Sequence, residues 1–157
     1  LAADLGLDGD ASVAYRPRSR ATTPAALGEE LRERRERDLE RGFTAHGPHR
    51  DEIALSRGDR DLRSFGSQGQ QRLAVLALLL AERESIADER GAAPLMLLDD
   101  ALSELDADRR ERVVARLGER GQSVITTTDA ALVPIGEDRG VRLAVADGAV
   151  LAEATAT

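Results

Sequence analysis

The sequence predicts an α/β fold in which helices flank a parallel sheet. Its first sign is a run of four apolar residues, Leu95–Leu98, that ends abruptly in Asp99 and Asp100, as is typical of a strand buried on both faces. The second sign is a β-rich run over Val124–Thr128. Residues 107–117 between them have helical apolar spacing, and a strand, helix and strand joined by short connections predict a right-handed parallel crossover.

The N-terminal part is expected to contain a strand and an exposed helix. Residues 12–16 alternate in polarity and stop at Pro17, which predicts an edge strand followed by a loop. A helix is predicted over residues 24–41, because Thr23 precedes a proline and Gly42 follows the last arginine. Its three leucines form a narrow stripe among charges of mixed sign, so most of its surface should be solvated.

The middle of the chain is expected to form a hairpin and then a long helix. Ile53 and Leu55 alternate with polar residues, residues 58–59 make a turn, and Leu62 starts the predicted return strand. Residues 67–84 predict a helix that is apolar nearly all round over Leu73–Ala81 and is therefore buried against a sheet.

A second hairpin is predicted near the C-terminus. It covers residues 141–152, and its turn is expected at Asp147 and Gly148. The whole chain has 157 residues, 41% of them hydrophobic, which suits one compact domain with a sizeable core.

Composition excludes several classes of protein. All 22 basic residues are arginine, so the chain holds no complete GxxxxGK[ST] phosphate-binding loop, and any nucleotide site needs residues from elsewhere. A net charge of -7 argues against a broadly basic nucleic-acid surface, so any DNA contact must be local. Three aromatic residues are too few for a base-stacking platform. The absence of cysteine excludes a disulfide scaffold and fits a reducing compartment.

Membrane insertion is not expected either. The longest apolar run has far fewer than the roughly 18 residues of a spanning helix, and nothing near Leu1 resembles a secretion signal. Because residue 1 is leucine and not methionine, we expect a fragment or processed product of a longer protein.

The strongest chemical feature is the carboxylate pair that follows strand 95–98. It lies at the sheet edge where open α/β folds bind ligands. Phosphate-bound Mg²⁺ needs hard oxygen ligands on a rigid support, and a buried strand gives that support. We therefore expect Asp99 to hold the metal, directly or through water, and Asp100 to orient or deprotonate the attacking water. Alternatively the pair only caps the next turn, although repulsion between adjacent carboxylates favours a functional role.

A second feature opens the helix predicted from residue 67. Ser67, Gln68, Gly69 and Gln70 lie at a helix N-terminus, where free N–H groups and the helix dipole favour phosphate. The alternative is a Ser-x-x-Gln capping box, which needs no ligand. A glycine in the first turn costs about 1 kcal/mol relative to alanine, which makes sense if another backbone or a phosphate approaches closely.

Two further segments are ambiguous by themselves. Ser103–Asp106 lies three residues beyond the carboxylate pair, and Asp106 is a plausible N-cap of the next helix. Thr126–Asp129 ends the second strand, where a hydroxyl or carboxylate would meet a γ-phosphate, but threonine is also an ordinary strand residue.

Taken in order, these four segments resemble the C-terminal half of an ATP-binding-cassette ATPase. The sequence is similar to the RecF family of DNA replication and repair proteins, closely over about residues 43–130 and loosely elsewhere. The resemblance is carried by Gly47–Glu52, Gly66–Arg72, Leu97–Asp106 and Ile125–Asp129.

The resemblance implies a role for each candidate residue. Segment 67–70 corresponds to the signature motif, which reaches across a dimer to the γ-phosphate bound by the partner. Asp99 falls on the Walker B metal position, and Asp100 falls on the catalytic carboxylate, which is glutamate in most cassettes. Asp106 matches the D-loop aspartate.

The remaining positions follow the family pattern less closely. Thr128 or Asp129 lies near the switch position, where many relatives have histidine. His46 and His49 belong to the family-like Gly-Pro-His-Arg stretch, and we interpret both as structural. Residues 1–42 are expected to form part of a helical arm, and residues 43–157 the C-terminal part of the ATPase domain.

RecF-like proteins are cytoplasmic ATPases that use ATP and Mg²⁺ and dimerise on ATP. They bind DNA near single-strand to double-strand junctions and load recombinase at gaps with mediator proteins, in recombinational repair and the SOS response. The resemblance implies these properties for the complete protein. Since the chain lacks the phosphate-binding loop, it should not bind ATP productively alone.

Two alternatives remain at this point. One is a chromosome-maintenance ATPase head of the SMC type, with helix 24–41 as the stump of a coiled-coil arm, although three leucines in eighteen residues do not sustain a heptad. The other is a non-catalytic interaction module. A GxxxxGK[ST] loop upstream of the chain would favour an ATPase over the module.

Overall fold

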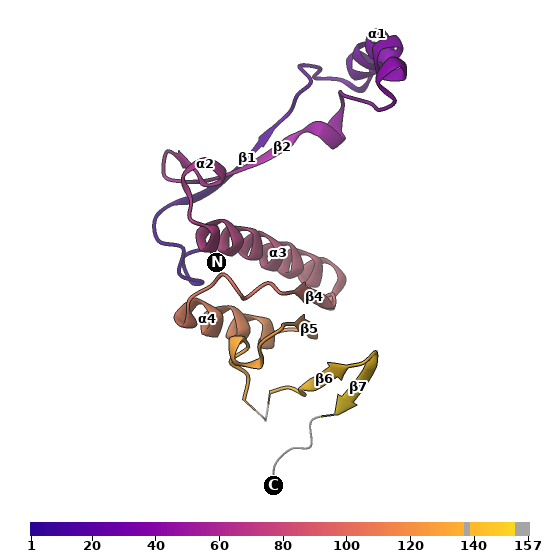
Figure 1. The fold of residues 1–157 in the computed structure, drawn as a ribbon. Helices are drawn as coiled ribbons and strands as arrows, with labels where there is room; N and C mark the ends of the chain where they lie inside the picture. The colour runs from indigo at the N-terminus through magenta and orange to yellow at the C-terminus, as the bar shows by residue number, and fades with distance from the viewer. Residues whose placement is uncertain (137–138, 153–157) are drawn as a thin grey trace.

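The computed structural model describes residues 1–136 and 139–152. The chain starts in a helix-and-sheet body, runs out along an extended arm to α1, returns to the body and ends in a separate hairpin (Figure 1). The elements are β1 (Ala11–Arg16), α1 (Pro24–Arg41), a 3-10 turn (Pro48–Arg50), β2 (Glu52–Arg57), β3 (Arg60–Asp61), α2 (Leu62–Phe65), α3 (Gln68–Arg90), β4 (Met96–Asp99), α4 (Ala107–Gly118), β5 (Ser123–Thr126), a 3-10 turn (Ala130–Leu132), β6 (Leu143–Ala146) and β7 (Ala149–Ala152).

The body confirms the predicted α/β fold. Strands β4 and β5 pair in parallel, with Met96 opposite Ser123 and Asp99 opposite Thr126, and α4 forms the crossover between them. Helix α4 begins at the predicted N-cap, Asp106, whose side chain accepts a hydrogen bond from the backbone N–H of Arg109. The long helix α3 shares the core with β4 and ends at Arg90, six residues beyond the predicted end.

The core lies between α3, α4 and the sheet, and the extreme N-terminus helps to fill it. Leu73 of α3 and Val113 of α4 are fully buried, and Leu98 of β4 is 5% exposed. Leu5 and Leu7 are equally buried in this cluster, although no sequence pattern before residue 12 predicted a structural role for them. These long-range contacts anchor the chain start against the body.

The prediction that strand 95–98 is buried on both faces was wrong. Leu97 is 71% exposed, and within residues 1–136 and 139–152 β4 pairs with β5 alone. The helix of residues 68–90 is likewise covered on one side only, because Val75 and Leu79 are exposed. The physical reason is that a two-stranded sheet gives these elements one packing surface, so the apolar side chains that face the other way stay in solvent.

The return strand of the first hairpin lies before Leu62, where it was predicted to start. It consists of β3 alone, and Leu62, which was expected to start it, begins helix α2. The side chain of Asp61 caps this helix by accepting from the N–H of Ser64 at 3.2 Å, and Leu62 turns into the core. The cap and the burial of one leucine therefore end the strand after two residues.

The arm is a two-stranded ribbon with a helix at its tip. Strand β1 pairs antiparallel with β2, with Ala11 opposite Arg57 and Arg16 opposite Glu52, and the ribbon carries α1 away from the body (Figure 1). The predicted bounds and caps of α1 are confirmed, with Thr23 accepting from the N–H of Ala26 and Gly42 at φ 75°. No residue of α1 is buried, so its exposed character is also confirmed.

Polar contacts fix α1 to the turn that precedes β2. Nε2 of the buried His46 lies 2.6 Å from Oε2 of Glu30, which also accepts from the hydroxyl of Ser19 at 2.8 Å. These bonds, the one from His46 above all, hold the pKa of the Glu30 carboxyl below its usual value. The second histidine, His49, bonds to the carbonyl of Thr44 at 2.8 Å. Both histidines therefore have structural partners.

We expect His46→Ala to raise the pKa of Glu30 toward the ordinary value of about 4.3. A lowered folded-state pKa stabilises the arm at pH values above the ordinary one, and this contribution disappears as pH falls through the lowered value. A carboxyl carbon NMR titration of Glu30 in both proteins measures the change. If the titration curve of Glu30 is unchanged in His46→Ala, a group other than His46 lowers the pKa of Glu30.

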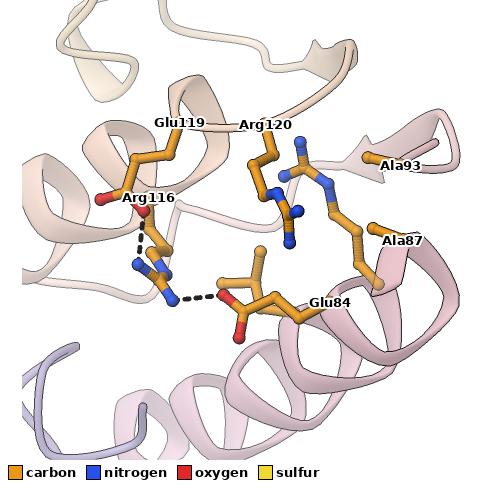
Figure 2. Close-up of a pocket in the computed structure, with 8 residues that line it drawn as sticks. Glu84, Ala87, Ala93, Arg116, Glu119 and Arg120 are labelled. Atoms are coloured by element: carbon orange, nitrogen blue, oxygen red, sulfur yellow. Dashed lines mark hydrogen bonds and ion pairs between the residues drawn. The ribbon is translucent and has the colours of Figure 1, made fainter. Parts of the chain in front are cut away.

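A cluster of charged side chains links α3 to the end of α4. The guanidinium of Arg116 lies between the carboxylates of Glu84 on α3 and Glu119, and it bonds to both (Figure 2). The neighbouring Arg83 is only 3% exposed, and its Nη1 and Nη2 both donate hydrogen bonds to the carbonyl of Leu117 at 3.3 Å. Burial lowers the pKa of this guanidinium. The bond satisfies a carbonyl in the last turn of α4, where the helix dipole favours a cation.

The C-terminal hairpin was predicted correctly. Strands β6 and β7 pair antiparallel around Asp147 and Gly148, whose φ values of 51° and 75° are those of a type I′ turn. Over the ranges that the structure describes, no helix has the length and apolar character needed to cross a membrane.

Candidate functional site

The two predicted carboxylates lie at the carboxyl end of β4. The side chain of Asp99 accepts a hydrogen bond from the hydroxyl of Thr126, the residue paired with it on β5. Asp100 follows, and its N–H donates to the carbonyl of Thr126 at 3.1 Å. Both carboxylates are exposed, so the sheet fixes their backbones while their oxygens stay accessible to a ligand.

Asp100 has a strained backbone. Its φ is 45°, in the left-handed region that an L-residue enters at a cost on the order of 1 kcal/mol. Such conformations persist where neighbouring contacts determine them, and they are concentrated at functional sites. Three groups provide these contacts: the carbonyl of Thr126 accepts from the N–H of Asp100, and the side chains of Arg72 and Ser103 both donate to its carbonyl, at 2.6 and 3.1 Å.

The start of α3 contains the capping box that was weighed as the alternative to a phosphate site. Ser67 Oγ accepts from the N–H of Gln70 at 3.2 Å, and the side-chain oxygen of Gln70 accepts from the N–H of Ser67 at 2.9 Å. The capping box does not explain why residue 69 is a glycine. A Cβ built on this residue would lie 2.9 Å from the carbonyl oxygen of Glu104. A second backbone therefore approaches Gly69 closely, which is one of the two reasons expected for a glycine here.

The loop between Asp100 and Asp106 joins the two features. Arg72, in the second turn of α3, reaches this loop with Nη1, which lies 2.6 Å from the Asp100 carbonyl and 3.2 Å from Ser103 Oγ. Arg110 of α4 holds its other side by donating to the carbonyls of Leu102 and Ser103 at 3.1 and 3.3 Å. The helix start at residues 67–70 and the carboxylate pair are thus parts of one connected structure.

Sequence reasoning missed Arg72 and Arg110. The signals available for Arg72 were its place at the beginning of an apolar helical run and at the end of Gly66–Arg72, one of the segments that carry the family resemblance. Its partners lie about 30 residues away in sequence, and no local pattern predicts such a contact.

The other candidate residues are Asp106, Thr128 and Asp129, which lie in the segments that follow β4 and β5. Asp106 caps α4 and forms an ion pair with Arg109 at 3.3 Å. Asp129 caps the following 3-10 turn by accepting from the N–H of Ala131 at 2.9 Å, and the side chain of Thr128 is exposed. In the described part of the chain, neither Thr128 nor Asp129 is hydrogen-bonded to the carboxylate pair.

The carboxylate pair suits phosphate-bound Mg²⁺. This ion is usually held by one or two protein carboxylates and by oxygens of the substrate phosphates and water, not by a protein cage. Two exposed carboxylates at a rigid strand end meet that requirement. Among the residues with described positions, no group of three or more His, Cys, Asp or Glu forms a cation cage.

No protein-family profile matches the chain. It is 49% identical over 107 residues to the DNA replication and repair protein RecF of Gloeobacter violaceus, covering 68% of this chain and 28% of that protein. It is 40% identical over 153 residues to RecF of Trichlorobacter lovleyi, covering 93% of this chain and 41% of that protein. The chain therefore spans well under half the length of these relatives.

Two solved RecF structures also match the chain. The recombination mediator protein RecF with ATPrS, described as part of the RecFOR pathway, matches with a TM-score of 0.61 and 28% identity, covering 92% of this chain and 40% of that one. The structure of RecF with ATP matches with a TM-score of 0.60, also at 28% identity, covering 92% and 39%. The arrangement of helices and strands is therefore shared over nearly the whole chain.

Proposed function

Because the chain corresponds to the C-terminal part of a RecF-family DNA replication and repair protein, we propose that it supplies one half of a shared ATP site. The observation that carries this proposal is the connection between the carboxylates at the end of β4 and the helix start at residues 67–70. Gly69 and Arg72 make that connection through the loop that begins at Asp100. Below, "the full-length protein" is a RecF-family protein that carries this chain as its C-terminal part.

Asp99 and Asp100 have different roles in this proposal. Thr126 occupies one oxygen of Asp99, and we assign the remaining oxygen to Mg²⁺ of the nucleotide. When bound, the ion neutralises phosphate charge. Asp100 orients the attacking water and accepts its proton, and its fixed backbone keeps the carboxylate in place for that step.

The helix start at residues 67–70 is assigned to the second nucleotide of a homodimer. A helix N-terminus offers N–H groups and a positive dipole end to a phosphate. Ser67 and Gln68 are exposed there, and Asp106 is exposed nearby at the start of α4. We place Thr128 and Asp129, which follow β5, near the γ-phosphate of the chain's own nucleotide.

DNA is proposed as the macromolecular partner, and the arm as its contact. Residues 11–66 contain 12 arginines and 10 acidic residues, whereas the whole chain has 22 and 29. Arginine is thus concentrated in this segment, which has a small net positive charge and contains the ribbon and α1 that extend from the body (Figure 1). This proposal predicts ATP-dependent binding to gapped DNA that weakens as the salt concentration rises. Binding titrations at several salt concentrations measure it. Cytoplasmic recombinational repair with mediator proteins, including the SOS response, is the setting that we propose.

We expect the 157-residue chain alone to show no ATP turnover above background. Its residues include no lysine to neutralise the β- and γ-phosphates, so the shared site is incomplete. The measurement is phosphate release at saturating Mg-ATP, with the full-length protein as the positive control. Steady turnover by the pure chain that Asp99→Ala abolishes would contradict the proposal. A full-length protein that neither binds nor hydrolyses ATP would instead favour a non-catalytic interaction module.

A further inference from the structure

Arg72 is the only side chain of α3 with described hydrogen bonds to the loop between Asp100 and Asp106. It is half-buried, and its Nη1 donates to the Asp100 carbonyl at 2.6 Å and to Ser103 Oγ at 3.2 Å. The hydroxyl of Ser103 donates in turn to the same Asp100 carbonyl at 3.1 Å. Arg72, Ser103 and Asp100 thus form a closed triangle of hydrogen bonds.

This triangle determines the backbone of Asp100 from one side, and β5 determines it from the other. The N–H of Asp100 is held by the carbonyl of Thr126 at 3.1 Å. With both its N–H and its carbonyl fixed, Asp100 stays at φ 45°, a conformation that aspartate does not prefer. This backbone sets the direction in which the side chain leaves Asp100.

We propose that Arg72 is a positioning residue for Asp100 and couples it to the helix start at residues 67–70. This inference rests on the proposed function, in which those residues contact one nucleotide and Asp100 acts at the other. Arg72 lies one turn after Ser67–Gln70 on the same helix, so a displacement of that helix start is transmitted to the Asp100 carbonyl. Gly69 adds a second point of contact, since the Glu104 carbonyl lies against it.

The identity of the side chain matters for this role. An arginine presents a planar guanidinium whose donors have fixed directions, whereas a lysine ammonium is a mobile point charge. Arg72→Lys should therefore keep part of the contact, and Arg72→Ala should remove it. Arg90→Ala is the matched control, because Arg90 is an exposed arginine in the last turn of the same helix.

Hydrogen exchange on the full-length protein tests the positioning without nucleotide. We expect peptides that contain the Asp100 amide to exchange at least 10-fold faster in Arg72→Ala, with an intermediate rate in Arg72→Lys and the parent rate in Arg90→Ala. Peptides from α4 around Val113 report whether the variant is folded, and their exchange should not change. Unchanged exchange at Asp100 in Arg72→Ala would overturn the inference.

Kinetics on the same variants test the coupling to hydrolysis. We expect Arg72→Ala to lower kcat at least 10-fold while KM for ATP changes less than 2-fold, with partial recovery in Arg72→Lys. Equal kcat in Arg72→Ala and the parent protein, where Asp100→Asn is inactive, would overturn the inference and leave the proposed function intact. If neither the parent nor Asp100→Asn hydrolyses ATP, the proposed function fails, and the coupling fails with it.

Discussion

Asp100→Asn in the full-length protein is expected to lower the rate of ATP hydrolysis at least about 100-fold, the usual contribution of a general base. The substitution keeps the size of the side chain and removes the charge that accepts a proton from water. ATP binding should survive, because Asp99 is assigned to the metal and is untouched. Phosphate release measures the first effect, and equilibrium binding of ATP measures the second. Asp99→Ala is the contrasting variant, in which binding itself should weaken.

The same variant tests the shared site. If the helix start at residues 67–70 contacts the nucleotide of a second copy, unhydrolysed ATP should hold Asp100→Asn as a dimer. Adding Ser67→Arg places bulk and charge at that helix start and should return the protein to monomers. Sedimentation with and without ATP distinguishes these states. An Asp100→Asn protein that stays monomeric at saturating ATP, or a double variant that still dimerises, would contradict the shared site.

Leu73→Ala is expected to lower the free energy of unfolding of the chain by about 2–5 kcal/mol, the range for a buried leucine replaced by alanine. Leu73 is fully buried in α3, in the core that also contains Leu5, Leu7 and Val113. Removing its side chain leaves a cavity where the N-terminal segment meets the helix. Urea denaturation followed by circular dichroism measures the loss.

Leu79→Ala on the same helix is the matched control. Leu79 is 39% exposed, so the same chemical change removes less buried surface, and a clearly smaller loss is expected. Equal losses in the two variants would mean that the body does not pack as described. Leu79→Ala alone could also weaken binding to the rest of the full-length protein. That effect would come from the exposed face of α3 and would be separate from the loss of stability.

The elements that the sequence predicted correctly are those with local signals. Helix α1 has a proline and a capping threonine at its start and a glycine at its end, and the structure keeps all three. Helix α4 begins at the predicted Asp106, and the hairpin of β6 and β7 turns at Asp147. The end of β4 at Asp99 was visible because a change from apolar residues to adjacent carboxylates stands out in any sequence window.

The candidate site was only partly visible. The sequence indicated that Gly69 meets either another backbone or a phosphate, and the structure shows the backbone of Glu104 against it. It did not indicate Arg72, which fixes the Asp100 carbonyl from 28 residues away. Nor did it indicate the left-handed conformation of Asp100, which depends on contacts from both α3 and β5.

By itself, the sequence determined where α1 and α4 begin and where the hairpin of β6 and β7 turns, and it indicated which residues are candidates for chemistry, because caps, turns and periodicity act over a few residues. Only the tertiary structure decided which surfaces are covered. Leu5 and Leu7 became core residues through contact with α3 and α4, about 65 to 110 residues away, while Leu97, in the most apolar strand, stayed exposed. Burial depends on which distant elements are present to pack against a side chain, and no local pattern contains that information.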